Sequence, residues 1–271
     1  MEASHGTVGR HIEALEATYG VQLFRRTRSG LELTSAGRSL VPIAEQAETL
    51  FHGARRRMQG LDREETGVVR FSMTGVMAYE IVAPILVKFF EAYPGIDVEM
   101  RVTDRMEDIN RLETDVSMRF ADEITDDVTA RRLYPMALGY YASREYLEKH
   151  MDKAGSDGEG LHWIGWDKVD RTPGWRSRTP LSKATAHHAT TDHVLQVSLA
   201  RKGFGIVNTS IYFERVFPEL VLVPGTTPAL SRSLWILLHS ELRRTTRVRR
   251  FVDFLAKEMA ALRPLIQGPY S

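Results

Sequence analysis

The chain has 271 residues, of which 43% are hydrophobic and 26% charged, the balance of a soluble globular protein with one large or two modest domains. Its formal net charge of +1 neither requires nor excludes a nucleic-acid partner, so any basic surface must be local. The absence of cysteine excludes disulfide frameworks, thiolate zinc sites and cysteine nucleophiles. The most apolar run, residues 81–90, is about half a membrane span and the first residues show no signal-peptide pattern, so we expect a cytoplasmic protein.

The first 34 residues are predicted to form a helix and a β-hairpin. Apolar residues at helical spacing predict a helix over residues 7–17, which Ser4 caps and Gly20 ends. The stretch 25–33 has a basic and an apolar arm on either side of a Ser-Gly pair, which predicts a hairpin turn.

A long helix is predicted from Thr34, its N-cap, to about residue 61. Its apolar residues follow steps of three and four and leave one thin stripe, the pattern of a two-stranded coiled coil. The alternative is an amphipathic helix packed on its own domain, but the polar residues on the other faces favour pairing with a second copy. The predicted dimerisation residues are Leu40, Ile43, Ala47, Leu50 and Ala54.

Beyond a charged linker over residues 62–67, the hydrophobic periodicity alternates between that of strands and that of helices. Such alternation predicts βαβ units and a mainly parallel sheet. The predicted strands are 68–73, 96–102, 116–120, 136–142, 163–166, 205–208, 221–223 and 234–239. The predicted helices are 78–93, 108–113, 192–202 and 245–262, with a surface loop over 151–160.

Several ordered motifs resemble those of LysR-type transcriptional regulators, and together they span nearly the whole chain. The first three resemble the family's winged helix-turn-helix, with the recognition helix over 4–17 and the wing over 23–34, and the later ones resemble its effector domain. The motifs are SHGTVGRHI at 4–12, GVQLFRR at 20–26, LTSAG at 33–37, YPG at 93–95, DVSMRF at 115–120 and RKGFGI at 201–206.

The resemblance implies an α/β protein whose effector domain is two-lobed, periplasmic-binding-protein-like and doubly wound in the Rossmann-like manner. Family members carry one further helix and most of a second before the recognition helix, so we expect either a start codon assigned too late or a naturally shortened protein. The predicted domains are a partial winged helix-turn-helix over 1–34, a linker and dimerisation helix over 35–66, and an effector-binding domain over 67–271, with lobe I at 67–142 and 241–271 and lobe II at 143–240.

The function implied by the resemblance is transcription regulation by a dimer or tetramer that binds double-stranded promoter DNA and a small-molecule effector between the two lobes. The alternative is an effector-binding module that has lost DNA binding through truncation of its helix-turn-helix. No catalytic motif or metal-ligand spacing occurs, so we predict no enzyme activity and no metal or other cofactor.

The N-terminal residues of a recognition helix reach base edges in the major groove, where Arg10 is able to make a bidentate contact with guanine. We expect the wing arginines to contact phosphates. The alternative is that these arginines only keep an exposed hairpin soluble. The predicted DNA-binding residues are Ser4, His5, Thr7, Arg10, Arg25, Arg26 and Arg28.

Ligands of doubly wound sheets bind beyond the carboxyl ends of strands, where helix N-termini present free N–H groups. Such a cleft, built of hydroxyls and helix N-termini, suits a small carboxylate or an aromatic acid. Arg119 has two interpretations: it pairs with an effector carboxylate, or with a neighbouring acid such as Asp115 or Asp122. The predicted effector-binding residues are Thr74, Thr103, Arg119, Phe120, Thr191 and His193.

Overall fold

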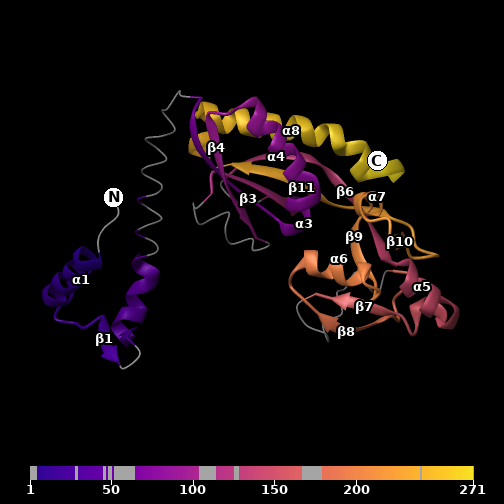
Figure 1. Cartoon of the computed structure of the whole chain (residues 1–271), viewed down its shortest axis with the longest axis horizontal. Coiled ribbons are helices and arrows are strands. Elements are labelled where there is room, and N and C mark those ends of the chain that lie inside the picture. Colours follow the sequence, from indigo (N-terminus) through magenta and orange to yellow (C-terminus); the bar gives the residue numbers. More distant parts are fainter. Residues whose placement is uncertain are drawn as a thin grey trace. The chain divides into compact units, whose positions relative to one another are not determined.

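The computed structural model in Figure 1 describes residues 5–27, 30–44, 47, 51, 65–103, 114–124, 128–166, 179–238 and 240–270. The chain forms two compact units, Met1–Met58 and Gln59–Ser271. Some predictions lie outside the described residues or side chains: those on Ser4, Arg28, Leu50, Ala54, the helix 108–113, most of the linker 62–67, and the side chains of His5 and Thr7.

The first unit contains a helix, a hairpin and the start of a second helix. These elements are α1 (His5–Tyr19), β1 (Phe24–Thr27), β2 (Gly30–Leu33) and a helical segment over residues 35–44. Gly20 follows α1 with a φ of 63°, a value that glycine adopts without strain, as predicted for the residue that ends this helix. β1 and β2 pair antiparallel from Phe24–Leu33 to Thr27–Gly30, which confirms the hairpin.

Hydrogen bonds and one close approach hold the first unit together. The Glu16 carboxylate accepts from the backbone N–H groups of Leu23 at 2.6 Å and Phe24 at 3.0 Å, which ties α1 to the hairpin. The hydroxyl of Thr34 accepts from the backbone N–H of Gly37 at 3.1 Å, which confirms Thr34 as an N-cap. A Cβ on Gly37 would lie 2.2 Å from the carbonyl oxygen of Leu23, so only glycine fits there.

The second unit is built on a seven-stranded sheet in the order β10-β6-β11-β5-β3-β4, with β9 also paired to β6 (Figure 1). The strands are β3 (Gly67–Met73), β4 (Ile96–Val102), β5 (Val116–Ala121), β6 (Thr129–Ser143), β9 (Val207–Ser210), β10 (Leu220–Leu222) and β11 (Ala229–Leu238), and a separate pair is formed by β7 (His162–Gly165) and β8 (Thr185–Ala189).

Helices connect these strands. One continuous helix from residue 75 to residue 92 consists of α3 (Gly75–Met77), the π-helical turn η1 (Ala78–Val82) and α4 (Ala83–Ala92). The others are α5 (Arg144–His150), η3 (Met151–Lys153), η4 (Ser156–Gly158), α6 (His193–Arg201), α7 (Tyr212–Val216), η6 (Ser240–Arg244), α8 (Thr246–Gln267) and η7 (Gly268–Tyr270). None of the helices in the described part of the chain is both long and apolar enough to cross a membrane.

The prediction of a mainly parallel sheet is wrong. Parallel pairing joins β3 to β4, β3 to β5 and β7 to β8. By contrast, β11 runs antiparallel to β5 and β6, and β6 runs antiparallel to β9 and β10. The reason is that β6 and β11 are long strands that run in opposite directions through both halves of the unit, a connection that local periodicity does not reveal.

Separate hydrophobic cores define two lobes. Lobe I surrounds a core in which the ring centroid of Phe251 on α8 lies 5.0 Å from that of Phe71 on β3 and 5.0 Å from that of Phe89 on α4, so α4 and α8 lie side by side (Figure 1). Lobe II contains two smaller cores, one between α5 and β7 and one between α6, α7 and β9. Tyr141 belongs to the latter core although it lies on the strand β6.

The lobe boundaries differ from the predicted ones. The predicted limits at 142/143 and 240/241 put Tyr141 and Ala142 in lobe I and put Leu234, Ile236 and Leu238 in lobe II, whereas the cores contain them in the opposite lobes. The boundaries fall inside β6 and β11 rather than in loops, because each strand pairs along both lobes.

Among the α-helices and β-strands of the described residues, three were not predicted, and neither were the short helices η3, η4, η6 and η7. The three are α5, which begins directly after β6 with Ser143 as its N-cap, the short polar strand β8 and the one-turn helix α7. β8 consists of Thr, Ala and His residues and lacks the apolar alternation that marks strands 96–102, so its position is set by pairing with β7.

Candidate functional site

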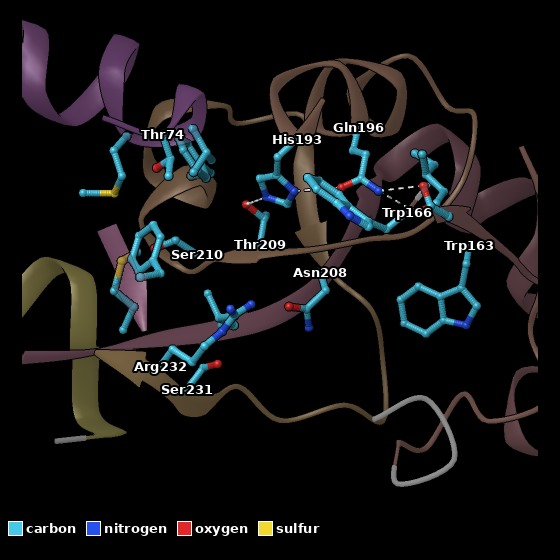
Figure 2. Close-up of a pocket in the computed structure, with 18 of the residues that line it drawn as sticks. Thr74, Trp163, Trp166, His193, Gln196, Asn208, Thr209, Ser210, Ser231 and Arg232 are labelled. Atoms are coloured by element: carbon cyan, nitrogen blue, oxygen red, sulfur yellow. Dashed lines mark hydrogen bonds between the residues drawn. The ribbon is translucent and has the colours of Figure 1, made fainter. Parts of the chain in front are cut away.

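A cavity of about 540 Å³ opens between the two lobes, and Figure 2 shows its polar side chains pointing into it. Apolar and aromatic side chains form most of its walls, among them Phe120 of β5, Trp163 of β7 and Phe213 of α7. The remaining lining residues are Thr74, Val76, Met77, Arg119, Met136, Leu138, Ile164, Gly165, Trp166, Ala186, His193, Gln196, Asn208, Thr209, Ser210, Ser231 and Arg232.

Four of the six predicted effector-binding residues line this one cavity. Thr74 and Phe120 come from lobe I, as does Arg119, and His193 comes from the first residue of α6 in lobe II. These residues lie at the ends of strands or the starts of helices, where the sequence predicted a ligand site.

His193 lies within a connected set of hydrogen bonds. Its Nδ1 is 2.8 Å from Oε1 of Gln196, and its Nε2 is 3.2 Å from Oγ1 of Thr209, as the dashed lines in Figure 2 show. Gln196 in turn donates to the carbonyl oxygens of Ile164 at 3.1 Å and Gly165 at 2.8 Å. This network joins α6, β7 and β9 and holds the histidine ring at the cavity wall.

Arg119 reaches the cavity from the lobe I sheet, with only 2% of its surface exposed. Its Nη2 donates to the hydroxyl of Ser72 at 2.7 Å, and its Nη1 donates to the carbonyl oxygen of Met118 at 2.9 Å. Ser72 also lies 2.9 Å from the hydroxyl of Ser117, so a buried polar network fixes the guanidinium. The carboxylate of Asp115 accepts from the backbone N–H of Arg70 at 2.8 Å.

The helices α3 and α6 begin beside the cavity, and the side chains that precede them differ in whether they cap the helix with a hydrogen bond. The Asp192 carboxylate accepts from the backbone N–H of Leu195 at 3.0 Å, so α6 carries its own capping anion. The Thr74 side chain makes no such capping bond at α3, and within the described part of the chain its buried Oγ1 has no hydrogen-bond partner. An unbonded donor and acceptor therefore faces the cavity from lobe I.

Thr103 and Thr191 are not among the residues that line this cavity, so their role in effector binding stays a prediction. They line a second cavity of about 540 Å³, together with Tyr79 and Asp192, among others. The lobes are in contact beside it: a Cβ on Gly75 of α3 would lie 3.1 Å from Cγ2 of Val194 on α6. Gly75 and Val194 line the second cavity, and Trp166 lines both cavities.

Sequence reasoning missed several lining residues. Gln196 carried a usable signal, because it lies on the same helix face as Leu199 and Ala200, three and four residues later, and a buried amide needs internal partners. No signal in the sequence marked Arg232 or Thr209 as a lining residue. Arg232 lies on the segment of β11 that passes between the lobes, and Thr209 lies in a strand of unremarkable composition.

The predicted DNA-binding side chains that the structure describes are exposed. Arg10 lies on α1, and Arg25 and Arg26 lie on β1. Arg25 pairs with Glu32 on the neighbouring strand at 2.9 Å, and with 64% and 45% of the side chains exposed such a pair contributes little stability. Both arginines on β1 therefore remain available to an anionic partner.

The predicted dimerisation seam lies open within the single chain. Leu40 is half-buried, while Ile43 is 59% exposed and Ala47 is exposed. Across the described residues, no group of three or more histidine or carboxylate side chains is arranged to hold a metal ion. The absence of a metal site stays a prediction.

Two family models match the chain and together cover nearly all of it. Residues 62–260 match the LysR substrate binding domain, and residues 1–38 match the bacterial regulatory helix-turn-helix protein of the lysR family. Among curated relatives, the probable HTH-type transcriptional regulator LtrA of Klebsiella pneumoniae is 23% identical over 94% of this chain and 86% of its own length. The HTH-type transcriptional regulator CrgA of Neisseria meningitidis is 24% identical over 94% of this chain and 88% of its own.

Solved structures share the fold. The structure of CrgA, a LysR-type transcriptional regulator from Neisseria meningitidis, matches with a TM-score of 0.64 and 23% identity over 94% of this chain and 89% of that one. Full-length AphB, the Vibrio cholerae virulence activator, matches with a TM-score of 0.61 and 20% identity over 93% and 89% of the two chains. The expected α/β fold with a two-lobed domain is therefore confirmed, and the curated relatives are regulators rather than enzymes. The chain belongs to the LysR family of transcriptional regulators, with its helix-turn-helix in the first unit and its substrate-binding domain in the second.

Proposed function

We propose that this regulator binds promoter DNA through α1 and the β1–β2 wing, acts in the cytoplasm as a dimer or tetramer, and responds to a small carboxylate held between its lobes. An aromatic carboxylate fits best. The observation that carries the effector class is the combination of aromatic walls with two arginines in the interlobe cavity.

The composition of the cavity supports an anionic, partly apolar ligand. Arg119 and Arg232 contribute positive charge, and none of the described lining residues is an aspartate or a glutamate. Trp163, Phe120 and Phe213 provide flat apolar surface. A volume of about 540 Å³ lies within the range of about 300–1,000 Å³ usual for small-molecule sites, and guanidinium groups bind carboxylates through strong charge-assisted hydrogen bonds.

Calorimetric titration of the full chain tests the effector class. The panel consists of the sodium salts of acetate, benzoate and 1-naphthoate, with neutral benzamide and cationic benzylammonium for comparison. We expect the aromatic carboxylates to bind more tightly than the other compounds, and Arg232→Gln to weaken that binding by about tenfold, the loss of one charge-assisted contact. Arg249→Gln, at an exposed position on α8, is the matched control. Binding of the cation alone, or of nothing in the panel, would contradict the proposal.

A gel-shift assay on the DNA upstream of the protein's own gene tests DNA binding. We expect affinity to fall steeply with salt, and Arg26→Ala to reduce the salt slope by about one counterion without changing sequence preference. Arg10→Ala should instead relax preference at one base pair, worth about 1–3 kcal/mol. If no retardation occurs at low salt, the effector-binding module without DNA binding becomes the better interpretation.

Light scattering tests self-association. Ile43 is 59% exposed on the predicted seam, so Ile43→Asp places a charge where a second copy would bury an apolar side chain. We expect this variant to shift the full chain to a lower mass, while Val41→Asp, at an apolar side chain 38% exposed on the other side of the same helix, leaves the mass unchanged. Equal masses for Ile43→Asp and the unaltered chain would remove the seam from the proposal.

A further inference from the structure

The buried amide of Gln196 has only one orientation that satisfies its neighbours. Its Nε2 lies 3.1 Å from the carbonyl oxygen of Ile164 and 2.8 Å from that of Gly165, and both oxygens only accept hydrogen bonds. A flipped amide would set its own oxygen against these two acceptors, at a cost that a side chain only 5% exposed cannot recover from water. Oε1 of Gln196 therefore faces His193 (Figure 2).

This orientation fixes which nitrogen of His193 carries the proton. An amide oxygen accepts only, so Nδ1 of His193, 2.8 Å away, must donate to it. When the ring is neutral, Nε2 then has a lone pair and accepts from the hydroxyl of Thr209 at 3.2 Å. In that state Thr209 uses its one proton inside the protein and offers only lone pairs to the cavity.

Protonation of His193 reverses the polarity of this wall. Nε2–H then donates to Thr209 Oγ1, which releases the hydroxyl proton of Thr209 to donate elsewhere. Thr209 lines the cavity, so this proton can be donated to an oxygen of a bound effector. The same wall is thus unfavourable to an anion when His193 is neutral and favourable when it is charged.

The charges around the cavity couple this change to an anion. Arg119 and Arg232 line the same cavity and oppose a third positive charge on His193 while the cavity holds no anion. Asp192, the preceding residue, directs its carboxylate to the backbone N–H of Leu195 and lines the neighbouring cavity. A bound carboxylate adds the negative charge that favours the imidazolium.

We propose that Gln196 is a positioning residue that holds neutral His193 as its Nδ1–H tautomer, and that an anionic effector binds with uptake of one proton by His193 Nε2. The second part rests on the proposed function for the class of effector. The proton comes from solvent, the only bond formed is N–H, and the site gains one positive charge for the negative charge that enters.

Two-bond ¹H–¹⁵N correlation spectra of the full chain labelled with ¹⁵N-histidine test the tautomer without any effector. The signals that disappear in His193→Asn identify the ring. At about pH 8, where histidine is mostly neutral, we expect a protonated Nδ1 and an unprotonated Nε2, the reverse of free histidine in water. Gln196→Met should shift His193 toward the Nε2–H form, and Thr209→Val should leave the Nδ1–H form in place. An Nε2–H tautomer in the unaltered chain would overturn the proposal.

Benzoate titrated into the full chain tests the proton uptake. We expect affinity to rise by up to about tenfold per pH unit as the pH falls from about 8 to about 6, the limit for one linked proton. Calorimetry in phosphate and in Tris buffer should show uptake from the difference in buffer ionisation heats. His193→Asn should flatten this pH dependence, while His188→Asn, at an exposed histidine that does not line the cavity, should keep it.

The outcomes separate the two proposals. Benzoate binding of equal affinity at both pH values, with no proton uptake, overturns the coupling and leaves the proposed function intact. A lack of benzoate binding at either pH contradicts the coupling and the carboxylate effector together. Retained pH dependence in His193→Asn assigns the proton to another group and overturns the role of His193.

Discussion

The two compact units of the chain differ in how they keep their shape. Among the described residues of Met1–Met58, only Gly37 is buried, and the apolar Val8 and Leu15 on α1 remain 45% and 40% exposed. In Gln59–Ser271, Phe71 and Val82 are fully buried within a large core. The first unit thus depends on local capping bonds and a close backbone approach, and the second depends on apolar packing between distant segments.

The largest expected effect is a loss of stability in the second unit, Gln59–Ser271. Phe71→Ala removes a ring that is fully buried against Phe251, and we expect a loss of about 3–5 kcal/mol from the free energy of unfolding because the cavity cannot collapse fully. All four tryptophans lie in the second unit, so tryptophan fluorescence during urea unfolding measures this unit alone. Phe90→Ala, at a side chain 39% exposed, should cost much less. Equal losses in both variants would mean that the lobe I core is not tightly packed.

A smaller loss of stability is expected from a substitution in the first unit, Met1–Met58. Gly37→Ala forces a Cβ to 2.2 Å from the carbonyl oxygen of Leu23, and overpacking of this kind costs about 1–3 kcal/mol. We expect faster proteolysis within residues 1–58 and weaker DNA binding, with no change in tryptophan fluorescence unfolding. Gly9→Ala is the matched control, because its Cβ would meet nothing within 4 Å and alanine favours the helix by about 1 kcal/mol. Equal protease resistance in the two variants would show that local close approach does not hold this unit.

The smallest expected effect is a dependence of stability on pH that comes from His150 of α5 in lobe II. Burial lowers the pKa of His150 below its ordinary value, and Lys149, His162 and Lys153 lower it further by repulsion. The folded chain therefore binds this proton less tightly than the unfolded chain. The corresponding stability is complete above about pH 6.5, the ordinary pKa of histidine, and is lost as the pH falls below it.

Replacement of His150 tests this assignment. His150 stacks on Tyr146 with ring centroids 4.5 Å apart, so His150→Phe keeps an aromatic contact and removes the titrating group. We expect the melting temperature of the second unit to fall less between about pH 8 and about pH 6 in this variant than in the unaltered chain. His188→Phe, at an exposed histidine of β8, should keep the original pH dependence. An unchanged slope in His150→Phe would assign the effect to other groups.

Local patterns were sufficient wherever a few neighbouring residues decide the structure. Thr34 caps its helix, Gly20 takes a positive φ after α1, and the hairpin at 25–33 forms as expected. The alternating strand over 96–102 is also present as β4. Its alternate apolar residues are buried unequally: Ile96 is buried, while Met100 and Val102 are 51% and 45% exposed, because β4 lies at the edge of the sheet.

The motifs in the sequence by themselves determined the family, the two kinds of domain and most of the strands, because each depends on residues close together in the chain. Only the tertiary structure decided which predicted residues share a cavity: Thr74 and His193 line the cavity between the lobes, and Thr103 and Thr191 line the second cavity. The lobes that carry these residues are joined by the two passages of β6 and β11 and by the contact of α3 with α6. Periodicity specifies the face of an element that is buried, and the neighbour that covers this face is chosen by packing over the whole unit.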